Sequence, residues 1–448
     1  MLTRLKHTLT NMKKFILTTL ALLAAGTLVL SAQEEKEVKT GWSMGVLPCF
    51  TLSADNGLQY GAFGDVYYYG DGKTYPDPLH KISWEVSHFT KGKTRLYLGY
   101  DSKYLIPNMR VNASVTYVDD PMYNFWGFNG PASLSDYNLW ANKETMVNYY
   151  GMSRKMFRVL ANVQGRLADH LNWAAGVNFW NWQIGDMRTK IGYDLNQTLY
   201  RDYITLGAIR PEEQNGGNAL EFNTGLVFDT RDIEAAPNHG VWAEAYLNGN
   251  VLGQRYLKAC AYFRNYIDIP IPIPAGDPVL AYRVAWQQTL LGETPFYMIQ
   301  NVPLLVQRNM ISEGFGSSNT IRGIRENRIL AEGFAWANVE LRVKLVSFKL
   351  FNQFFYIATN PFFDAGIITK TYRNSAFDLM TDTPRLSGGR NIKNIYAETR
   401  AGDLVTSAGA GLKIAMNQNF IVSVEVAHTF YDPLNADLWL GIGINYQF

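Results

Sequence analysis

The sequence lacks several features that mark common protein classes. It holds only 2 cysteines in 448 residues, and 41 Lys and Arg nearly balance 39 Asp and Glu. A disulfide scaffold would be short and rich in cysteine, and a nucleic-acid binder would usually be basic. After residue 32, no apolar run reaches the roughly 20 residues that a membrane-spanning helix needs. The composition excludes these classes, and we expect no nucleic-acid partner.

Apolar and aromatic residues are nevertheless abundant. The chain is 47% hydrophobic and 14% aromatic, yet its mean hydropathy is only −0.14. A disordered chain would contain few aromatics. A large β-rich or mixed protein fits these values. A transmembrane β-barrel also fits, because apolar and polar residues alternate along its strands.

Residues 1–32 are predicted to be a secretory signal peptide. Two lysines follow Met12 directly, an uncharged apolar stretch covers 15–30, and small residues precede position 33. Met12 is therefore a more natural start than Met1. The competing interpretation is a membrane-anchoring helix, for which the stretch is short. Cleavage would leave 33–41 as a short periplasmic N-terminus of an exported protein.

Alternation with a period of two dominates the rest of the chain. From Asn338 to Leu345, even positions are polar or charged and odd positions are apolar. Four successive polar side chains on one face favour a strand between lipid and a water-filled lumen over a strand of a soluble sandwich. Sixteen segments follow such a pattern: 42–52, 57–70, 80–90, 93–103, 108–119, 146–167, 171–183, 218–231, 240–251, 255–268, 278–293, 334–347, 352–369, 401–416, 419–431 and 436–448.

The connections between these segments fall into two sets. If the N-terminus is periplasmic, the outer loops at 120–145, 184–217, 294–333 and 370–400 are long, while the periplasmic turns are mostly short. An even strand number and this asymmetry are typical of outer-membrane barrels. We therefore predict an all-β fold, a 16-stranded antiparallel transmembrane β-barrel over 42–448 in the bacterial outer membrane.

Three further segments carry a family resemblance. Asp229, Arg231 and Asp232 lie at the end of the eighth predicted strand, and Arg322-Gly323 lies in loop 294–333. The third segment is Phe362 to Gly366 on the thirteenth predicted strand, taken together with 338–342 on the twelfth. In this order and spacing they resemble the outer-membrane protein 85 superfamily. That superfamily includes barrel-assembly (Bam) insertases, two-partner-secretion translocases and bacterial surface antigens. Gly443, Tyr446 and the terminal Phe448 resemble the C-terminal assembly signal of outer-membrane barrels.

The resemblance implies a latch inside the lumen. The sixth outer loop, 294–333, would fold inward so that Arg322 pairs with Asp364 and Glu340 on the barrel wall. A guanidinium has five donors and can serve two carboxylates. Gly323 would allow a tight turn, and Gly366 would leave room beside the acid. The alternative is that Arg322 and Asp364 are unrelated solvated charges. The family usually has an aromatic residue where this chain has Ile324, so looser docking is expected.

The chain also departs from the family. The superfamily's insertases carry periplasmic polypeptide-transport-associated domains, for which 33–41 leaves no room, so the chain resembles a barrel-only branch. A periplasmic or outer-membrane protein partner would replace these receptor domains. Pro48 in the first strand, with Gly441 and Gly443 in the last, would weaken the closing seam. In the insertases this seam is a lateral gate.

The resulting functional prediction is assistance in assembly, insertion or translocation of proteins, or of lipids, at the outer membrane. The client proteins are not indicated, and outer-membrane lipid is an expected partner. The alternatives are a passive pore or transport barrel, and a structural or surface-binding barrel acting through loops 184–217 and 370–400. No nucleophile and base, nucleotide loop or metal-ligand spacing occurs, so we expect no enzyme, cofactor or metal.

Two smaller expectations concern side chains on the strands. Tyr67 to Tyr69 and the pair Trp180 and Trp182 are interpreted as interfacial girdles. Cys49 and Cys260 would lie on opposite walls of the barrel, so we expect no disulfide between them.

Overall fold

The computed structural model describes most of the chain. The described residues are 38–53, 56–75, 77–128, 149–188, 198–234, 236–271, 276–305, 309–312, 314–316, 319–350, 353–372, 401–416, 420–430 and 439–444. The predicted signal peptide lies outside them, as do Tyr446 and Phe448. None of the helices within this described part is long and apolar enough to cross a membrane.

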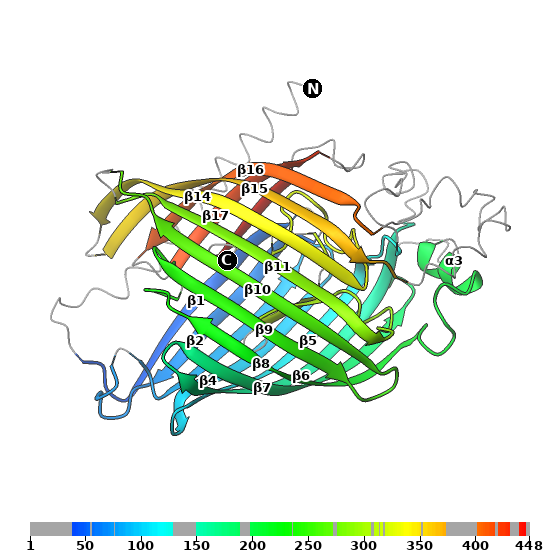
Figure 1. Ribbon diagram of the computed structural model, residues 1–448, viewed down its shortest axis with the longest axis horizontal. Coiled ribbons are helices and arrows are strands. Elements are labelled where there is room, and N and C mark those ends of the chain that lie inside the picture. The colour runs from blue at the N-terminus through cyan, green and yellow to red at the C-terminus, as the bar shows by residue number, and fades with distance from the viewer. Residues whose placement is uncertain are drawn as a thin grey trace.

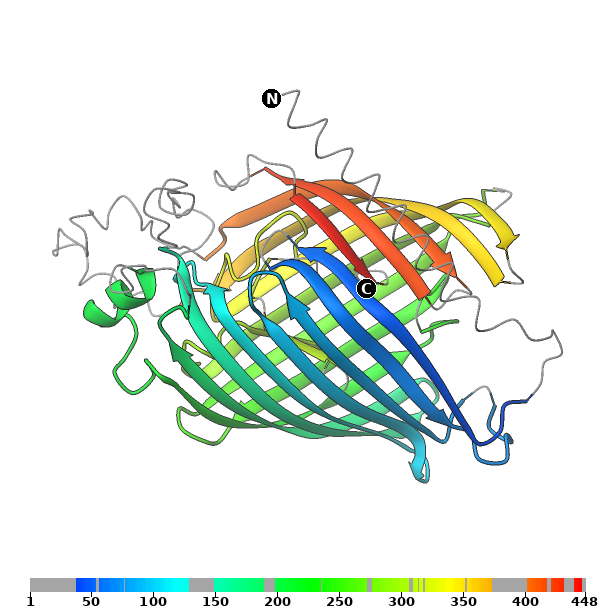
Figure 2. The ribbon, with the colours of Figure 1, turned by 180° about the vertical axis from the view of Figure 1, so that it is seen from behind.

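Sixteen strands close into one antiparallel barrel (Figures 1 and 2). The closed order is β1-β18-β17-β16-β15-β14-β11-β10-β9-β8-β7-β6-β5-β4-β3-β2. The strands are β1 (Trp42–Ser53), β2 (Gly57–Tyr68), β3 (His80–Phe89), β4 (Thr94–Ile106), β5 (Met109–Asn124), β6 (Gly151–Ala168), β7 (Leu171–Gly185), β8 (Gly216–Asp229), β9 (Gly240–Asn250), β10 (Tyr256–Asp268), β11 (Val279–Gly292), β14 (Gly333–Leu350), β15 (Gln353–Lys370), β16 (Leu404–Met416), β17 (Phe420–Thr429) and β18 (Trp439–Ile444). This confirms the predicted fold class.

Each predicted strand corresponds to one barrel strand, and the differences lie at strand ends and inside loops. β5 runs to Asn124, five residues past its predicted end. Three elements of the long loops were not predicted: helix α3 (Leu199–Thr205) and the hairpin of β12 (Asn301–Leu305) and β13 (Asn309–Ser312). Elements this short have too few residues for a clear periodic signal.

The two faces of β14 show why this alternation forms a barrel. Asn338, Glu340 and Arg342 are buried inside, whereas Val339 and Leu345 on the other face are 42% and 53% exposed. Large apolar side chains that a soluble protein would bury therefore point outward, where lipid would cover them. The polar face lines a lumen in which side chains and loops pair with one another.

The two tryptophans of β7 contradict the predicted girdle. Trp180 and Trp182 are fully buried. Trp180 donates a hydrogen bond to Glu221 (2.8 Å), and Trp182 donates to the sulfur of Met298 (3.1 Å). Tyr67 also turns inward and donates to Asp65. The girdle interpretation is wrong for these residues, because composition alone cannot distinguish an aromatic that faces the lumen from one at the lipid interface.

The two ends of the barrel differ. We call the end that carries the short connections after β4, β6, β14 and β16 the turn end, and the opposite end the loop end. At the loop end, α3 lies outside the strand ends (Figure 1), and a buried aromatic cluster joins the strands to the long loops. Its aromatic members are Tyr123, Phe125, Trp126, Phe128, Tyr149, Tyr150, Trp180, Trp182, Tyr200, Tyr203, Phe296, Tyr297 and Tyr372.

The two cysteines are both buried and unpaired, which confirms that no disulfide joins them. Cys49 lies on β1 and Cys260 on β10.

Candidate functional site

The connection between β11 and β14 enters the lumen, and Arg322 is its anchor. Its guanidinium binds Asp364 of β15 through two bonds, Nε to Oδ2 (2.9 Å) and Nη2 to Oδ1 (2.8 Å). The backbone N–H of Arg322 also donates to Asp364 Oδ2 (3.0 Å). Both side chains are 0% exposed. The structure thus places together the arginine and the acid that were singled out in the sequence.

Two further carboxylates on the barrel wall also lie close to Arg322. Arg322 Nη1 donates to Glu340 of β14 (3.0 Å) and lies 3.5 Å from Glu425 of β17. Glu340 also accepts from Arg342 (2.7 Å), and Glu425 accepts from Lys413 (2.9 Å). These bonds distribute the charge over three strands and two further cations, so the buried carboxylates are compensated.

The face of an aromatic ring completes the guanidinium's surroundings. The Arg322 Cζ lies 3.4 Å from the centre of the Phe362 ring. Burial alone would lower the pKa of the Arg322 guanidinium, but the charge of Asp364 and its hydrogen bonds raise it above the ordinary value. The group is therefore cationic, and a cation over a desolvated ring is attracted by the ring's electrons.

Gly366 has a defined spatial role on β15. A Cβ at this position would overlap the ring of Phe315, which belongs to the inward loop. Phe315 stacks on Phe334 of β14, with ring centres 4.6 Å apart, and meets Trp336 edge-on at 5.6 Å. Gly366 thus makes room for the loop, as predicted, and the loop residue that fills the space is Phe315.

The residues flanking Arg322 are tightly packed. Gly323 has a φ of +90°, a conformation that favours glycine, and a Cβ there would come within 3.2 Å of Ala427 and Thr429 of β17. Ile321 and Ile324 are both buried in the cluster that contains Phe315. The looser docking expected from Ile324 is therefore not what the packing shows.

A second set of bonds holds the loop backbone just before the arginine. Asn338 of β14 donates to the carbonyl of Thr320 (2.7 Å). Arg283 of β11 donates to Asn338 (2.7 and 2.9 Å) and to the carbonyl of Asn319 (2.8 Å). The loop is thus tied to the wall by its backbone as well as by its side chains.

The seam between β1 and β18 lies beside this latch. Only Leu52 and Ile442 are registered partners across it among the described residues, whereas β1 and β2 share twelve pairs. Figure 2 is viewed from this side, with β1 in blue and β18 in red. Pro48 and Gly443 lie on the two seam strands, and no atom lies within 4 Å of a Cβ built at Gly443. Gly441 instead leaves room for the ring of Trp439.

The inward loop also reaches the other side of the seam. Asn56, in the connection between β1 and β2, donates to both carboxylate oxygens of Glu326 (2.8 and 2.9 Å). Arg322, four residues before Glu326 in the same loop, binds β14, β15 and β17. One loop therefore contacts strands on one flank of the seam and the β1–β2 connection on the other.

The three residues singled out at the end of β8 lie at the turn end, away from the latch. Arg231 binds Asp229 through two bonds, Nε to Oδ1 (2.9 Å) and Nη2 to Oδ2 (2.6 Å). Asp232 accepts from the backbone N–H (3.0 Å) and side chain (2.8 Å) of Asn238. Together they shape the connection that leads into β9.

Sequence reasoning missed several members of the site. Glu425 and Phe362 contact the arginine. Asn360 donates to Glu340 and Glu425, and Lys413 donates to Glu425. Glu425 and Lys413 sit on the inward face of their strands, so alternation placed them in the lumen. Alternation does not indicate which lumen residues lie at the same depth, because that depends on strand stagger around the barrel.

Comparison with known proteins identifies the fold. No protein-family model and no curated protein matches the chain. The structure is similar to the crystal structure of BamA from Haemophilus ducreyi lacking POTRA domains 1–3, with 13% identity and a TM-score of 0.55, over 91% of this chain and 70% of that chain. CdiB from Escherichia coli is similar at 9% identity and a TM-score of 0.54, over 93% of this chain and 64% of that chain.

This chain thus spans less than two thirds of the length of CdiB. The likeness confirms the predicted resemblance at the level of the fold. That fold is an outer-membrane barrel of the BamA and CdiB type, and it indicates a location in the outer membrane.

Proposed function

We propose that the chain is a barrel of the outer-membrane protein 85 superfamily. Its role would be to assist the assembly, insertion or translocation of proteins, or of lipids, at the outer membrane. The working element is the seam between β1 and β18, and the role requires no covalent chemistry, cofactor or metal. Export by the predicted signal peptide belongs to the same proposal.

The observation that carries this proposal is the inward loop beside a seam where the described residues of β1 and β18 share one registered pair. A passive pore needs an open lumen, yet Arg322, Phe315 and Ile324 of the loop are buried inside the barrel. A surface-binding barrel has no need of a fully buried anchor that joins three strands. A loop that holds both flanks of the seam, through Arg322 and through Glu326, supports a barrel whose seam is controlled.

A disulfide across the seam tests this proposal. Leu52 and Ile442 are registered partners, so the variant L52C/I442C, with Cys49 and Cys260 changed to serine, can lock the seam. Levels of other outer-membrane proteins are compared in a deletion strain that carries either the parent chain or the locked chain. Deletion is expected to lower one or more of them, and the locked chain should restore them only after reduction.

The control links Leu52 by a disulfide to β2, the neighbouring strand on the side away from the seam. Leu52 is also the registered partner of Leu58 on β2, so L52C/L58C places an equivalent disulfide away from the seam and should complement fully. Unchanged levels of all other outer-membrane proteins on deletion would remove the insertion role. Full complementation by the oxidised, seam-locked chain would show that the seam need not open.

We further propose a protein partner that acts with the barrel as a receptor for its clients. Affinity purification of the intact barrel in mild detergent should yield one stoichiometric periplasmic or outer-membrane protein. Recovery of the barrel alone from cells that need it would contradict this.

A further inference from the structure

The connection between β8 and β9 lies across the lumen at the turn end. We call its described residues, 230–234 and 236–239, the mouth turn. On one side Glu234 accepts a bond from Arg110 at the start of β5 (3.1 Å). On the other side Ala236 packs against a buried cluster of Tyr356, Ala358, Ala415 and Ile421, from β15, β16 and β17.

These two contacts lie on opposite walls. β15 is eight strands from β5 in the closed order of sixteen. The mouth turn also meets β14, where Lys344 lies 3.5 Å from Asn238. A connection between two adjacent strands that touches both far walls must fold inward over the opening rather than point away from it.

The base of the mouth turn is rigid. The guanidinium of Arg231 is held by Asp229 and stacks on Trp242 of β9, with its Cζ 3.8 Å from the ring centre. It also donates to the carbonyl of Glu234 (3.1 Å). Asp232 joins the two arms of the turn by accepting from Asn238. The turn can therefore keep its own shape while its outer contacts change.

The contacts on the two walls differ in how tightly they pack. Between the mouth turn and β14 and β15 lies a small cavity of about 40 Å³. Towards β5 there are two cavities of about 350 and 440 Å³. Lys103, Arg110 and Glu234 line both of these, so the Arg110–Glu234 pair forms part of the partition between them.

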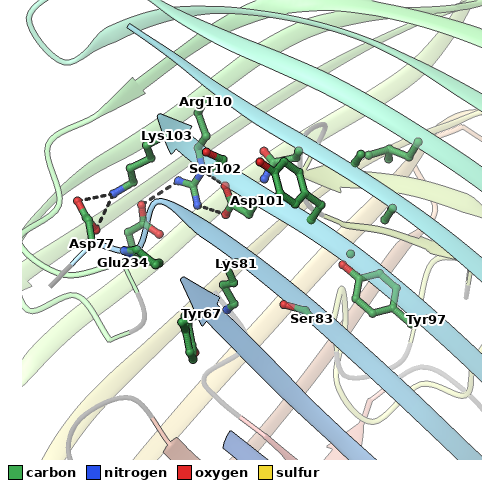
Figure 3. Close-up of a pocket in the computed structure, with 17 residues that line it drawn as sticks. Tyr67, Asp77, Lys81, Ser83, Tyr97, Asp101, Ser102, Lys103, Arg110 and Glu234 are labelled. Atoms are coloured by element: carbon green, nitrogen blue, oxygen red, sulfur yellow. Dashed lines mark hydrogen bonds and ion pairs between the residues drawn. The ribbon is translucent and has the colours of Figure 1, made fainter. Parts of the chain in front are cut away.

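Figure 3 shows this partition, with Arg110 between Asp101 of β4 and Glu234 of the mouth turn. Arg110 binds Asp101 through two bonds, Nε to Oδ1 (2.9 Å) and Nη2 to Oδ2 (2.5 Å). Its bond to Glu234 is single, and the Glu234 side chain is 49% exposed. The arginine is thus fixed to the wall whether or not the turn is bound.

We propose that the mouth turn is a gate at the turn end of the lumen, held shut by the Glu234–Arg110 ion pair. Breaking this pair weakens the attachment of the turn to β5, while Ala236 and the rigid base act as the hinge. The two cavities then merge into one passage that leads into the lumen. This inference concerns access to the lumen and does not depend on the proposed role of the seam.

The test measures access to a cysteine placed behind the gate. Ser114 lies on β5, four residues past Arg110, is buried and lines the smaller of the two cavities. S114C, in a chain with Cys49 and Cys260 changed to serine, is treated with a bulky water-soluble maleimide in detergent. Glu234→Gln is expected to raise the labelling rate by up to about five-fold, the population change that about 1 kcal/mol produces.

Two further variants keep the test decisive. Asp77→Asn also removes a half-exposed acid at the turn end, whose partner is Lys103 on the wall, and should leave the labelling rate unchanged. Arg110→Gln removes the same pair from the wall side and should raise the labelling rate of S114C as Glu234→Gln does. Gel mobility before and after heating verifies that each variant is a folded barrel. Equal labelling of the parent and Glu234→Gln chains, or an equal rise with Asp77→Asn, would overturn the gate.

Discussion

Two connections enter this barrel from opposite ends, and each meets the wall through an arginine and carboxylates. At the loop end, Arg322 is carried by the loop, and the acids Asp364, Glu340 and Glu425 belong to the wall. At the turn end the arrangement is reversed, since Arg110 belongs to the wall and Glu234 to the connection. The same chemistry thus serves in two different settings.

The two arginine–carboxylate contacts differ in how deeply they are buried. Every charged group that Arg322 binds is nearly or fully buried, whereas Glu234 is half exposed. Removing one partner of a buried pair leaves an uncompensated charge in a poorly solvated site, which is costly. Water replaces a lost partner at an exposed site, so such pairs contribute little. The difference indicates that the latch is permanent and the mouth turn is releasable.

Packing reinforces this difference. The inward loop inserts Phe315 into a space that only a glycine at 366 leaves open. The mouth turn borders two cavities on the side facing β5. A filled site resists displacement because leaving it would create a void. A turn beside existing cavities has room to move without that cost.

The largest expected effect comes from breaking the latch. Arg322→Ala should lower the free energy of unfolding by about 3–5 kcal/mol, because three wall carboxylates lose their shared partner. Asp364→Ala should have a similar effect, and the double variant should lose less than the sum of the two. Urea unfolding in detergent, followed by tryptophan fluorescence, measures all three. Strict additivity would show that the two residues are not coupled.

Closing the space at Gly366 should have the next largest effect. Gly366→Ala forces the Phe315 ring out of its place and should cost about 1–3 kcal/mol in the same unfolding experiment. Phe315→Ala should then add little in that background. Gly443→Ala on β18 is the matched control, since a Cβ there meets no atom within 4 Å. Equal losses at both glycines would mean that the loop contact is unimportant.

Removing the ring face above the guanidinium should have a smaller effect. Phe362→Leu keeps an apolar side chain but loses the cation–π contact, which is worth about 0.5–2 kcal/mol. Phe363→Leu is the control, because that neighbouring side chain points outward and is exposed. The unfolding free energies of the two variants are compared directly. A larger loss at Phe363 would contradict the assigned role of the ring.

The smallest effect is expected at the mouth turn. Glu234→Gln should change the free energy of unfolding by about 0–1 kcal/mol. Measurement at high salt distinguishes the mouth turn from the latch, because salt screens interactions between exposed charges much more than those between buried charges. The loss caused by Glu234→Gln should vanish at high salt, while that caused by Arg322→Ala should persist. A large, salt-independent loss at Glu234 would make the mouth turn a second fixed anchor.

Much of the fold could be predicted because the strands of a membrane barrel show a local alternation of polar and apolar residues. Apolar Val339 beside polar Asn338 and Glu340 already indicates which face meets lipid. The acids at 340 and 364 and Arg322 were recognisable through the order and spacing of a family resemblance. The helix α3 and the hairpin of β12 and β13 were not predictable, because short loop elements depend on what they pack against.

The sequence by itself determined the strand number, the inward faces and the residues available for the latch, since each depends on spacing along one strand. Only the tertiary structure decided which of these residues meet. It set Glu425 of β17 beside Arg322, placed Trp180 inside the barrel, filled the space at Gly366 with Phe315, and brought Glu234 to Arg110 across the lumen. The reason is that strand stagger, barrel closure and inward-folded connections bring residues together across distances that local periodicity does not encode.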